Sequence, residues 1–215
     1  HQMRYMEKYI FIKKLFQRKD FGKLSSVNII AGNCGLAMNA SHFIEGFRFI
    51  TSEKPDQVSA WLTKNKNINP RGSKFNDYSG IIKINSQNNK TLLINILEDN
   101  GNGIVHVYTS DKAIVTLDDL TGKISVRVRK KEFSKYPTNK YALPSVNKDF
   151  KVNMNELITS TAKIIEKLKN GKKTVTPEDA LINIKTITGA YLSSLKKNKN
   201  ISLKNHVKNV NFNWP

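Results

Sequence analysis

The sequence predicts an α+β fold: a single large, mainly antiparallel open-faced β-sheet with helices packed on one face. Short segments between residues 81 and 129 have the composition of strands, and clusters of turn residues separate them. The connections between these segments are too short to hold the helix that a parallel crossover requires. Helical periodicity is confined to the two ends of the chain, as expected when helices pack on a contiguous antiparallel sheet.

The first third of the chain is predicted to alternate between helices and strands. In order, we expect a helix over residues 5–17, a strand over 23–31, a helix ending near Thr51, a strand over 57–63 and a polar loop over 65–79. Asp20 and Gly22 end the first helix, since both favour turns. The loop is of a length that is uncommon unless the segment has a function.

The rest of the chain is predicted to form most of the sheet and two more helices. We expect strands over 81–85, 91–97, 104–108, 113–117 and 123–129, an irregular stretch over 132–151, helices over 154–170 and 177–195, and a short strand over 201–203. Thr176 is the predicted N-cap of the last helix. Pro177 at the first helical position and acidic residues in the first turn support this start.

One predicted strand indicates how the sheet is covered. Residues 92–97 are apolar on both alternating faces, which is typical of a strand buried on two sides. Helices are expected on one face only, so something else must cover the other face. A second copy of the chain is the simplest cover, and we therefore expect a homodimer or homotetramer formed through the sheet face.

Composition limits the class of protein. The chain has 215 residues, of which 39% are hydrophobic, and no apolar run is long enough to span a membrane. Cys34 is the only cysteine, so no internal disulfide can form, and we expect a reducing compartment, most simply the cytoplasm. His1 stands where an initiator methionine would, from which we expect a piece of a longer protein.

The net charge of +19 raises the question of nucleic-acid binding. Almost all of the positive charge is lysine, and it is spread along the whole chain. Nucleic-acid interfaces instead concentrate arginine and aromatic residues on one face. The densest basic runs, at 127–131 and 196–204, are short and far apart. We therefore expect neither a nucleic-acid partner nor a membrane partner.

The second predicted helix contains the candidate catalytic group. Asn39 and His42 are three residues apart, so both project from the same side of the helix, about one turn apart. Phe43, Phe47 and Ile50 would then pack inward. A half-buried imidazole with a polar neighbour can donate or accept a proton near neutral pH. The alternative is a histidine whose ring is satisfied by a backbone carbonyl near the start of the helix.

Three other polar residues are candidates for substrate binding. Arg71, in the long polar loop, can hold an anionic group with its forked guanidinium, and Arg4 can do the same just before the first helix. The alternative for both is a solvated surface arginine. Asn33, followed by Cys34 and Gly35, precedes the histidine helix and can bring backbone donors to the same pocket.

Cofactor and metal motifs are missing from the sequence. It contains no G-x-G-x-x-G and no P-loop, and Gly101 and Gly103 are expected to form a hairpin turn between two strands. The histidines at positions 1, 42, 106 and 206 lack suitably spaced partners, so no metal site is predicted. His106 lies in the middle of a predicted strand, where a packed or surface histidine is the preferred interpretation.

Three stretches resemble the C-terminal domain of the glucose-fructose oxidoreductase, inositol dehydrogenase and MocA (Gfo/Idh/MocA) family. Residues 1–5 and 20–24, with a helix between them, are similar to the opening of that domain. Residues 35–45 resemble its signature, in which small and polar residues precede a histidine, a hydrophobic residue and an acid. The closing helix and last strand of the family are similar to residues 174–180, 190–194 and 201–203.

The resemblance implies hydride transfer at a sugar or cyclitol hydroxyl, with NAD or NADP bound by an N-terminal Rossmann domain that these residues do not include. Residues 1–204 would form the substrate-binding and oligomerisation domain, and residues 205–215 a polar tail. The substrate, a sugar or nucleotide-sugar, would lie between the two domains. His42 falls on the catalytic histidine of the family, and no cofactor-binding residue is expected in this chain.

The chain departs from the family pattern beside this histidine. Family members carry Asp, or Asn in some nucleotide-sugar enzymes, four residues before the histidine, where this chain has Met38. Asn39 lies three residues before it and, because an amide is no general base, can only orient the substrate or the imidazole. We therefore expect the substrate-binding domain of a sugar oxidoreductase that is inactive by itself. The alternative is a non-catalytic binding or scaffold module of the same fold.

Overall fold

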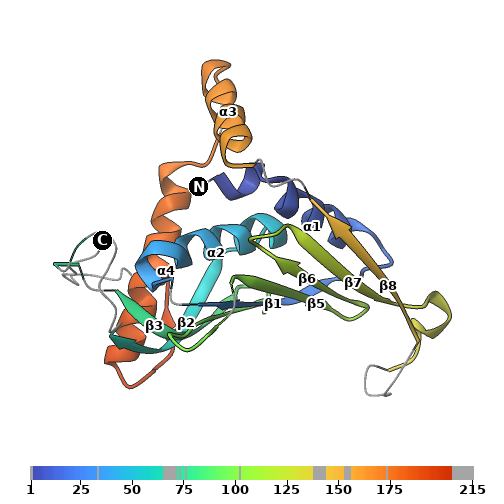
Figure 1. Ribbon diagram of the computed structural model, residues 1–215. Coiled ribbons are helices and arrows are strands. Elements are labelled where there is room, and N and C mark those ends of the chain that lie inside the picture. Colours follow the sequence, from blue (N-terminus) through green and yellow to red (C-terminus); the bar gives the residue numbers. More distant parts are fainter. Residues whose placement is uncertain are drawn as a thin grey trace.

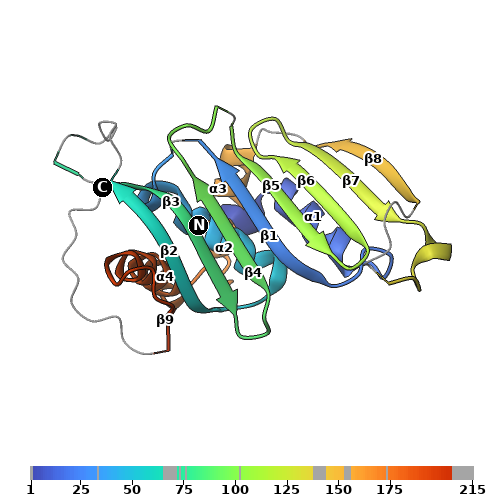
Figure 2. The same cartoon turned by 90° about the horizontal axis from the view of Figure 1, so that it is seen from below.

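The computed structural model describes residues 2–32, 34–64, 72, 74–75, 77–101, 103–137, 144–152, 156–172 and 174–204. A nine-stranded sheet forms one layer, and helices cover one of its faces (Figure 1). Seen from below, none of the described helices lies over the opposite face (Figure 2). This arrangement confirms the predicted α+β class.

The sheet has the strand order β8-β7-β6-β5-β1-β4-β3-β2-β9. Its strands are β1 (Leu24–Ala31), β2 (Pro55–Lys64), β3 (Tyr78–Ser86), β4 (Thr91–Ile96), β5 (Val105–Ser110), β6 (Ala113–Asp118), β7 (Lys123–Arg129), β8 (Ser145–Lys151) and β9 (Ile201–Ser202). Neighbouring strands are antiparallel except for β1 and β4, which run parallel. The sheet is therefore mainly antiparallel, as predicted.

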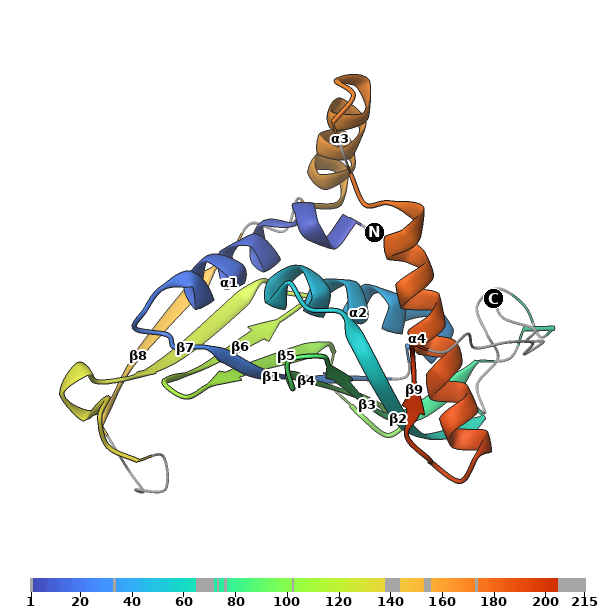
Figure 3. The same cartoon turned by 180° about the vertical axis from the view of Figure 1, so that it is seen from behind.

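The helices differ in how closely they pack on the sheet. They are the 3₁₀ helices η1 (Gln2–Tyr5) and η2 (Lys131–Phe133) and the α-helices α1 (Glu7–Gln17), α2 (Leu36–Thr51), α3 (Glu156–Lys169) and α4 (Pro177–Leu195). α1 and α2 lie over the sheet, whereas α3 projects away from it (Figures 1 and 3). α4 packs along β2, where the hydroxyls of Ser193 and Ser194 accept hydrogen bonds from the backbone N–H groups of Ala60 and Leu62, at 3.0 and 3.2 Å.

The core lies between the sheet and helices α1 and α2. Alternate residues of the central strands face the helices, and Val27, Ile29 and Ile94 are at most 2% exposed. α1 contributes the fully buried Ile12, and α2 contributes Phe47, which is almost fully buried. Each such side chain contributes about 2 kcal/mol through burial. The amphipathic patterns of both helices thus fix how they sit on the sheet.

One predicted hairpin is wrong. The turn around Gly101 and Gly103 was expected to join two paired strands, but β1 lies between β4 and β5 and pairs with both. The hairpins β3–β4, β5–β6 and β6–β7 form as predicted. Placing β1 in the centre of the sheet also brings α2, the element that follows it, over the middle of the helical face (Figure 1).

The irregular stretch predicted over residues 132–151 is wrong in its second half. Ser145–Lys151 form β8, which pairs with β7 along its whole length and forms one edge of the sheet. Six of its seven residues are exposed, and only Ser145 is partly covered. An edge strand with so little buried surface has no clear alternation of apolar and polar residues, and Pro144 directly before it favoured a loop.

Candidate functional site

The start of α2 is held by a residue from a distant part of the chain. Gly35 precedes the helix with φ +71°, and its missing side chain leaves the first N–H groups of the helix uncapped locally. Asp77, just before β3, caps them instead: its carboxylate accepts hydrogen bonds from the N–H groups of Ala37 and Met38, at 2.8 and 3.4 Å. A Cβ at Gly35 would collide with this carboxylate, so the glycine is required here.

His42 lies in the second turn of α2 and is half-buried. Burial is the main cause that lowers its pKa below the usual value, and the nearby negative charge of Asp119 acts in the opposite direction. The ring is therefore neutral at pH 7 and able to accept a proton. One turn earlier, the side-chain amide of Asn39 donates to the backbone oxygen of Cys34 and fixes the loop that enters the helix.

A group of polar residues, four of them buried and Asp119 partly buried, lies between α1 and the sheet, close to His42. We call Lys8, Tyr9, His106, Tyr108 and Asp119 the buried charge cluster. The ammonium group of Lys8 lies 3.2 Å from Oδ1 of Asp119, and the Tyr9 hydroxyl donates to the same oxygen at 2.6 Å. Lys8 also donates to the backbone oxygen of Asp119 at 2.8 Å. The turn after β6 is thereby tied to the first turn of α1.

His106 occupies the middle of this cluster. Its Nδ1 lies 3.1 Å from the Tyr108 hydroxyl, and its Nε2 lies 3.8 Å from Oδ1 of Asp119, beyond hydrogen-bond distance. The rings of Phe43 and Tyr9 pack against it, with ring centres 5.7 and 5.8 Å away. Burial lowers the pKa of His106 to about 4, so the ring is neutral at pH 7. Of the two predicted alternatives, a packed or a surface histidine, the structure shows the packed one.

Arg4, a predicted substrate-binding residue, takes part in an ion-pair network. Its Nε contacts the fully buried Glu45, and its Nη2 lies 3.5 Å from Oδ1 of Asp179. Arg48 pairs with the same two carboxylates, at 2.8 Å to Glu45. Asn183 donates to Glu45 at 3.3 Å. The network joins η1, α2 and α4 one turn beyond His42, and substrate contact by Arg4 stays a prediction.

The remaining predicted site residues, Arg71 and Asn33, lie outside the described residues. Asp119 and Lys8, by contrast, are polar neighbours of the site that sequence reasoning missed. Asp119 belongs to a turn, and Lys8 lies on a helix whose other two lysines are partly or fully exposed. Their 111-residue separation left no local signal of the contact, and only the fold brings them together.

The start of α2 does not fit a dinucleotide. A helix N-terminus binds phosphate through N–H groups that have no other partner. Here the carboxylate of Asp77 already accepts from two of them, and its charge would repel a phosphate. In the described parts of the chain, no three His, Cys, Asp or Glu residues are placed to hold a metal ion. Among the same residues, no helix combines the length and apolar character needed to cross a membrane.

Comparison with known proteins gives matches to solved structures. No family model matches the chain, and no curated protein matches it. The transcriptional regulator Gal80p from Kluyveromyces lactis matches with a TM-score of 0.70 and 14% identity, over 94% of this chain and 61% of that chain. Aldose-aldose oxidoreductase from Caulobacter crescentus matches with a TM-score of 0.67 and 15% identity, over 94% and 62% of the two chains. Scyllo-inositol dehydrogenase from Lactobacillus casei matches with a TM-score of 0.60 and 16% identity, over 95% and 64%.

These matches show the fold. Their identities are low, while nearly the whole of this chain superposes on each structure. The chain spans between 61% and 64% of the length of these three solved structures. The structural neighbours are oxidoreductases of the Gfo/Idh/MocA type, together with Gal80p. The chain therefore has the fold of the C-terminal domain of the Gfo/Idh/MocA-type oxidoreductases, as the sequence resemblance predicted.

Proposed function

We propose that this chain is the substrate-binding and oligomerisation domain of an NAD(P)-dependent oxidoreductase that acts on a hydroxyl of a sugar or nucleotide-sugar. The observation that carries the proposal is His42, a neutral, half-buried imidazole close to the partly buried carboxylate of Asp119, on a fold that an inositol dehydrogenase and an aldose oxidoreductase share. NAD or NADP would be bound by a Rossmann domain elsewhere in the protein.

His42 would act on the proton of the hydroxyl that is oxidised. A general base must be unprotonated before the reaction, and the lowered pKa of His42 keeps it so at neutral pH. Asp119 opposes this lowering and, by its negative charge, would stabilise the imidazolium after proton transfer. Asn39 holds the entry loop of α2 in place, so its contribution would be to the position of the site rather than to proton transfer.

The test is the rate of the full-length protein with a panel of aldoses, inositols and nucleotide-sugars. We expect His42→Ala to lower kcat by about 10²–10⁴, the usual size of a lost acid/base contribution. Ser41→Ala, the matched neighbour on the same helix, should change kcat by less than about 2-fold. A near-normal rate for His42→Ala, in a protein that keeps its thermal midpoint, would reject the catalytic role.

Arg71 offers a separate test of the substrate class. If its guanidinium holds an anionic group of a nucleotide-sugar, Arg71→Ala should raise KM by about 10-fold or more, the size of one lost charge-assisted contact. The kcat at saturation should change little, because this contact is the same in the ground and transition states. An unchanged KM for every nucleotide-sugar would leave Arg71 as a surface residue.

The alternative function is a non-catalytic binding or scaffold module. It is favoured by one comparison, the transcriptional regulator Gal80p, and by Met38 at the position where family members carry Asp or Asn. The two functions differ in one measurement on the full-length protein. A scaffold module would bind a sugar or NAD(P) without any change in cofactor absorbance at 340 nm over hours, whereas an oxidoreductase turns over.

The same proposal requires two surfaces of this chain, one that contacts the Rossmann domain and one that contacts a second copy of the chain. Exposed apolar side chains gather on α3 and on part of the surface of α4: Leu157 and Ile158 on α3 are 61% and 85% exposed, and Leu181 and Ile184 on α4 are 51% and 57% exposed. The apolar residues of α4 are thus only partly buried. We propose that the Rossmann domain contacts this helical side and that a second copy of the chain covers the open sheet face.

A further inference from the structure

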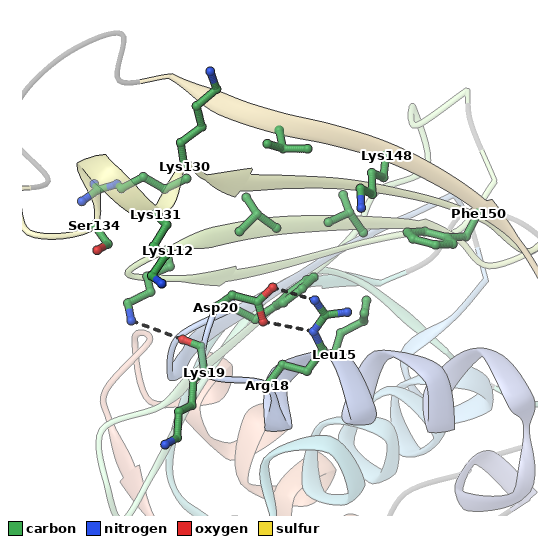
Figure 4. Close-up of a pocket in the computed structure, with 15 residues that line it drawn as sticks. Leu15, Arg18, Lys19, Asp20, Lys112, Lys130, Lys131, Ser134, Lys148 and Phe150 are labelled. Carbon is green, nitrogen blue, oxygen red and sulfur yellow. Dashed lines mark hydrogen bonds and ion pairs between the residues drawn. The ribbon is translucent and has the colours of Figure 1, made fainter.

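A cavity lies at the end of the sheet away from His42. Its volume is about 610 Å³, and it is lined by the last turn of α1 and the segment after it, the turn before β6, strands β7 and β8, and the segment around η2 (Figure 4). None of the five residues of the buried charge cluster lines it. Leu15, which does, lies six residues after Tyr9 on α1, a separation of about 9 Å along the helix axis. The cavity is therefore separate from the candidate catalytic site.

The rim of this cavity is strongly basic. Seven of the lining side chains are lysine or arginine, and Asp20 is the only carboxylate among the described lining residues. Arg18 already pairs with Asp20 through two hydrogen bonds, at 3.0 and 2.6 Å. Within the described part of the chain, Lys130 and Lys131 have no carboxylate at ion-pair distance. Unpaired cations around a concavity focus positive potential into it and attract anions.

The floor of the cavity is apolar. Val126 is 4% exposed and Phe21 is 3% exposed, and both belong to the core. Phe150 of β8 is 36% exposed and packs on Phe11, with ring centres 5.1 Å apart. Figure 4 shows Phe150 and Lys148 reaching from the same strand toward the cavity. Inorganic phosphate alone would leave this floor uncovered, whereas a ligand with a flat ring would bury it.

We propose that the cavity binds an organic polyanion that joins a diphosphate to a flat ring, the chemistry of a nucleoside diphosphate. The basic rim around Lys130 and Lys131 holds the diphosphate, since ammonium and guanidinium groups bind phosphate oxygens through charge-assisted hydrogen bonds. The ring lies on the apolar floor beside Phe150, where stacking on an aromatic side chain favours any base. The volume is in the range of sites for small organic ligands, about 300–1,000 Å³.

This inference does not depend on the proposed function. Net positive charge spread over the whole molecule predicts weak binding of any anion at many places. The cavity predicts something different: affinity that needs both the charged group and the ring, and that is lost only when residues of the cavity are changed. Binding is measured without turnover, so failure of the proposed enzyme activity would leave the result unaffected.

The experiment is calorimetric titration of the 215-residue chain with ADP and UDP at about 0.1 M salt, a concentration at which long-range attraction between exposed charges is largely screened. We expect dissociation constants on the order of 10–100 μM, with pyrophosphate and the unphosphorylated nucleosides each at least about 10-fold weaker. Lys130→Glu/Lys131→Glu should weaken ADP binding by about 10-fold or more. Lys169→Glu/Lys172→Glu, at the end of α3 and just after it, changes the net charge by the same amount. This control variant should change ADP binding by less than about 2-fold.

A second variant tests the floor. Phe150→Leu removes the ring but keeps an apolar side chain that can pack on Phe11, so it should change the thermal midpoint little, weaken ADP by about 5-fold or more, and leave pyrophosphate unaffected. Three results would overturn the proposal: no binding of ADP or UDP, equal loss of binding in the cavity and α3 charge variants, or pyrophosphate that binds as tightly as ADP. The first result excludes the ligand class. The second indicates that anions bind through the overall positive charge of the chain, and the third excludes a subsite for the ring.

Discussion

His106 shows at the residue scale how the fold sets the charge of a buried group. The ring is 2% exposed and lies between aromatic rings from α1 and α2, so its protonated form would lose almost all of its hydration. Lys8, in the same cluster, adds a positive charge that further disfavours the protonated form, although Asp119 acts in the opposite direction. The neutral ring lets the cluster keep one ion pair, between Lys8 and Asp119.

This environment predicts a pH dependence of stability. In the unfolded chain the histidine binds a proton below about pH 6.5, whereas the folded protein binds it only near the lowered pKa of about 4. Between these values the unfolded state binds more protons, so the free energy of unfolding rises with pH. From this residue we expect a loss of roughly 3 kcal/mol as the pH falls from 7 to 4.

Urea denaturation at pH 7 and pH 4.5 checks this prediction by comparing the parent chain with His106→Gln, which cannot titrate. The variant is expected to be less stable at pH 7, but its further loss on acidification should be smaller. Because the comparison is between two pH values of each protein, the cost of the substitution itself cancels. Equal pH dependence in both proteins would show that His106 takes up its proton in the native state, between pH 7 and pH 4.5, as it does in the unfolded chain.

Residue-scale features were predictable from the sequence only where the partners are close along the chain. The placement of Asn39 and His42 on one helix follows from their spacing, and the helix is observed. The capping box between Thr176 and Asp179 is likewise local: each side chain accepts from the backbone N–H of the other, at 3.2 Å. The contact of Lys8 with Asp119 spans 111 residues, and no periodicity or spacing reports such a contact.

At the scale of elements, α2 depends on a cap that belongs to another part of the chain. Asp77 is 6% exposed, and its carboxylate lies where the positive end of the helix dipole is strongest. We expect Asp77→Ala to lower the free energy of unfolding by about 1–2 kcal/mol, at the upper end for a lost N-cap because the freed N–H groups stay partly buried. Denaturant midpoints measured at pH 7 test the value.

Two further variants make this test specific. Asp77→Asn keeps an acceptor but loses the charge, so its loss of stability should be smaller than that of Asp77→Ala. Glu166→Ala, the control, removes an exposed carboxylate of α3, the helix that projects away from the sheet. A loss for Asp77→Ala no larger than that of the control would mean that α2 does not need this cap.

Elements were predicted correctly where burial imposes a periodic pattern of apolar residues, and they were missed where it does not. α4 is observed over the predicted residues Pro177–Leu195, because its caps are local and part of its surface packs on β2. β8 was missed because six of its seven residues are exposed, so burial imposes no alternation of apolar and polar residues on it. Its existence depends on pairing with β7, which is a property of the sheet rather than of the segment.

At the scale of the whole molecule, the position of β1 could not be predicted from local signals. Short connections favoured pairing between strands that follow one another, and this rule gave the hairpins correctly on both sides of β1. Inserting β1 between β4 and β5 requires pairing across more than 60 residues. This pairing makes β1 a hydrophobic central strand, and its inward residues Val27 and Ile29 are almost fully buried under α2.

The same insertion determines what the open face presents. Ile30 of β1 lies in the middle of the sheet and is 42% exposed, and Trp61 of β2 and Ile114 of β6 on the same sheet are 49% and 43% exposed. Their positions alternate with residues that face the helices. Large apolar side chains on a face that no described helix covers are typical of a surface that associates with another protein surface. We therefore expect self-association through this face, with Ile30 near its centre.

Ile30→Lys tests this expectation. In a monomer the new ammonium group would remain in water and cost little, whereas in a dimer it would be buried without a partner at a cost of several kcal/mol, enough to weaken association by about 10²–10³-fold. Ile158→Lys, at an 85% exposed position on α3, makes the same chemical change away from the sheet. Sedimentation velocity over a concentration series should show that Ile30→Lys dissociates while Ile158→Lys keeps the parent mass. A parent chain that is monomeric at every concentration, or dissociation by the α3 variant alone, would place the interface elsewhere or remove it.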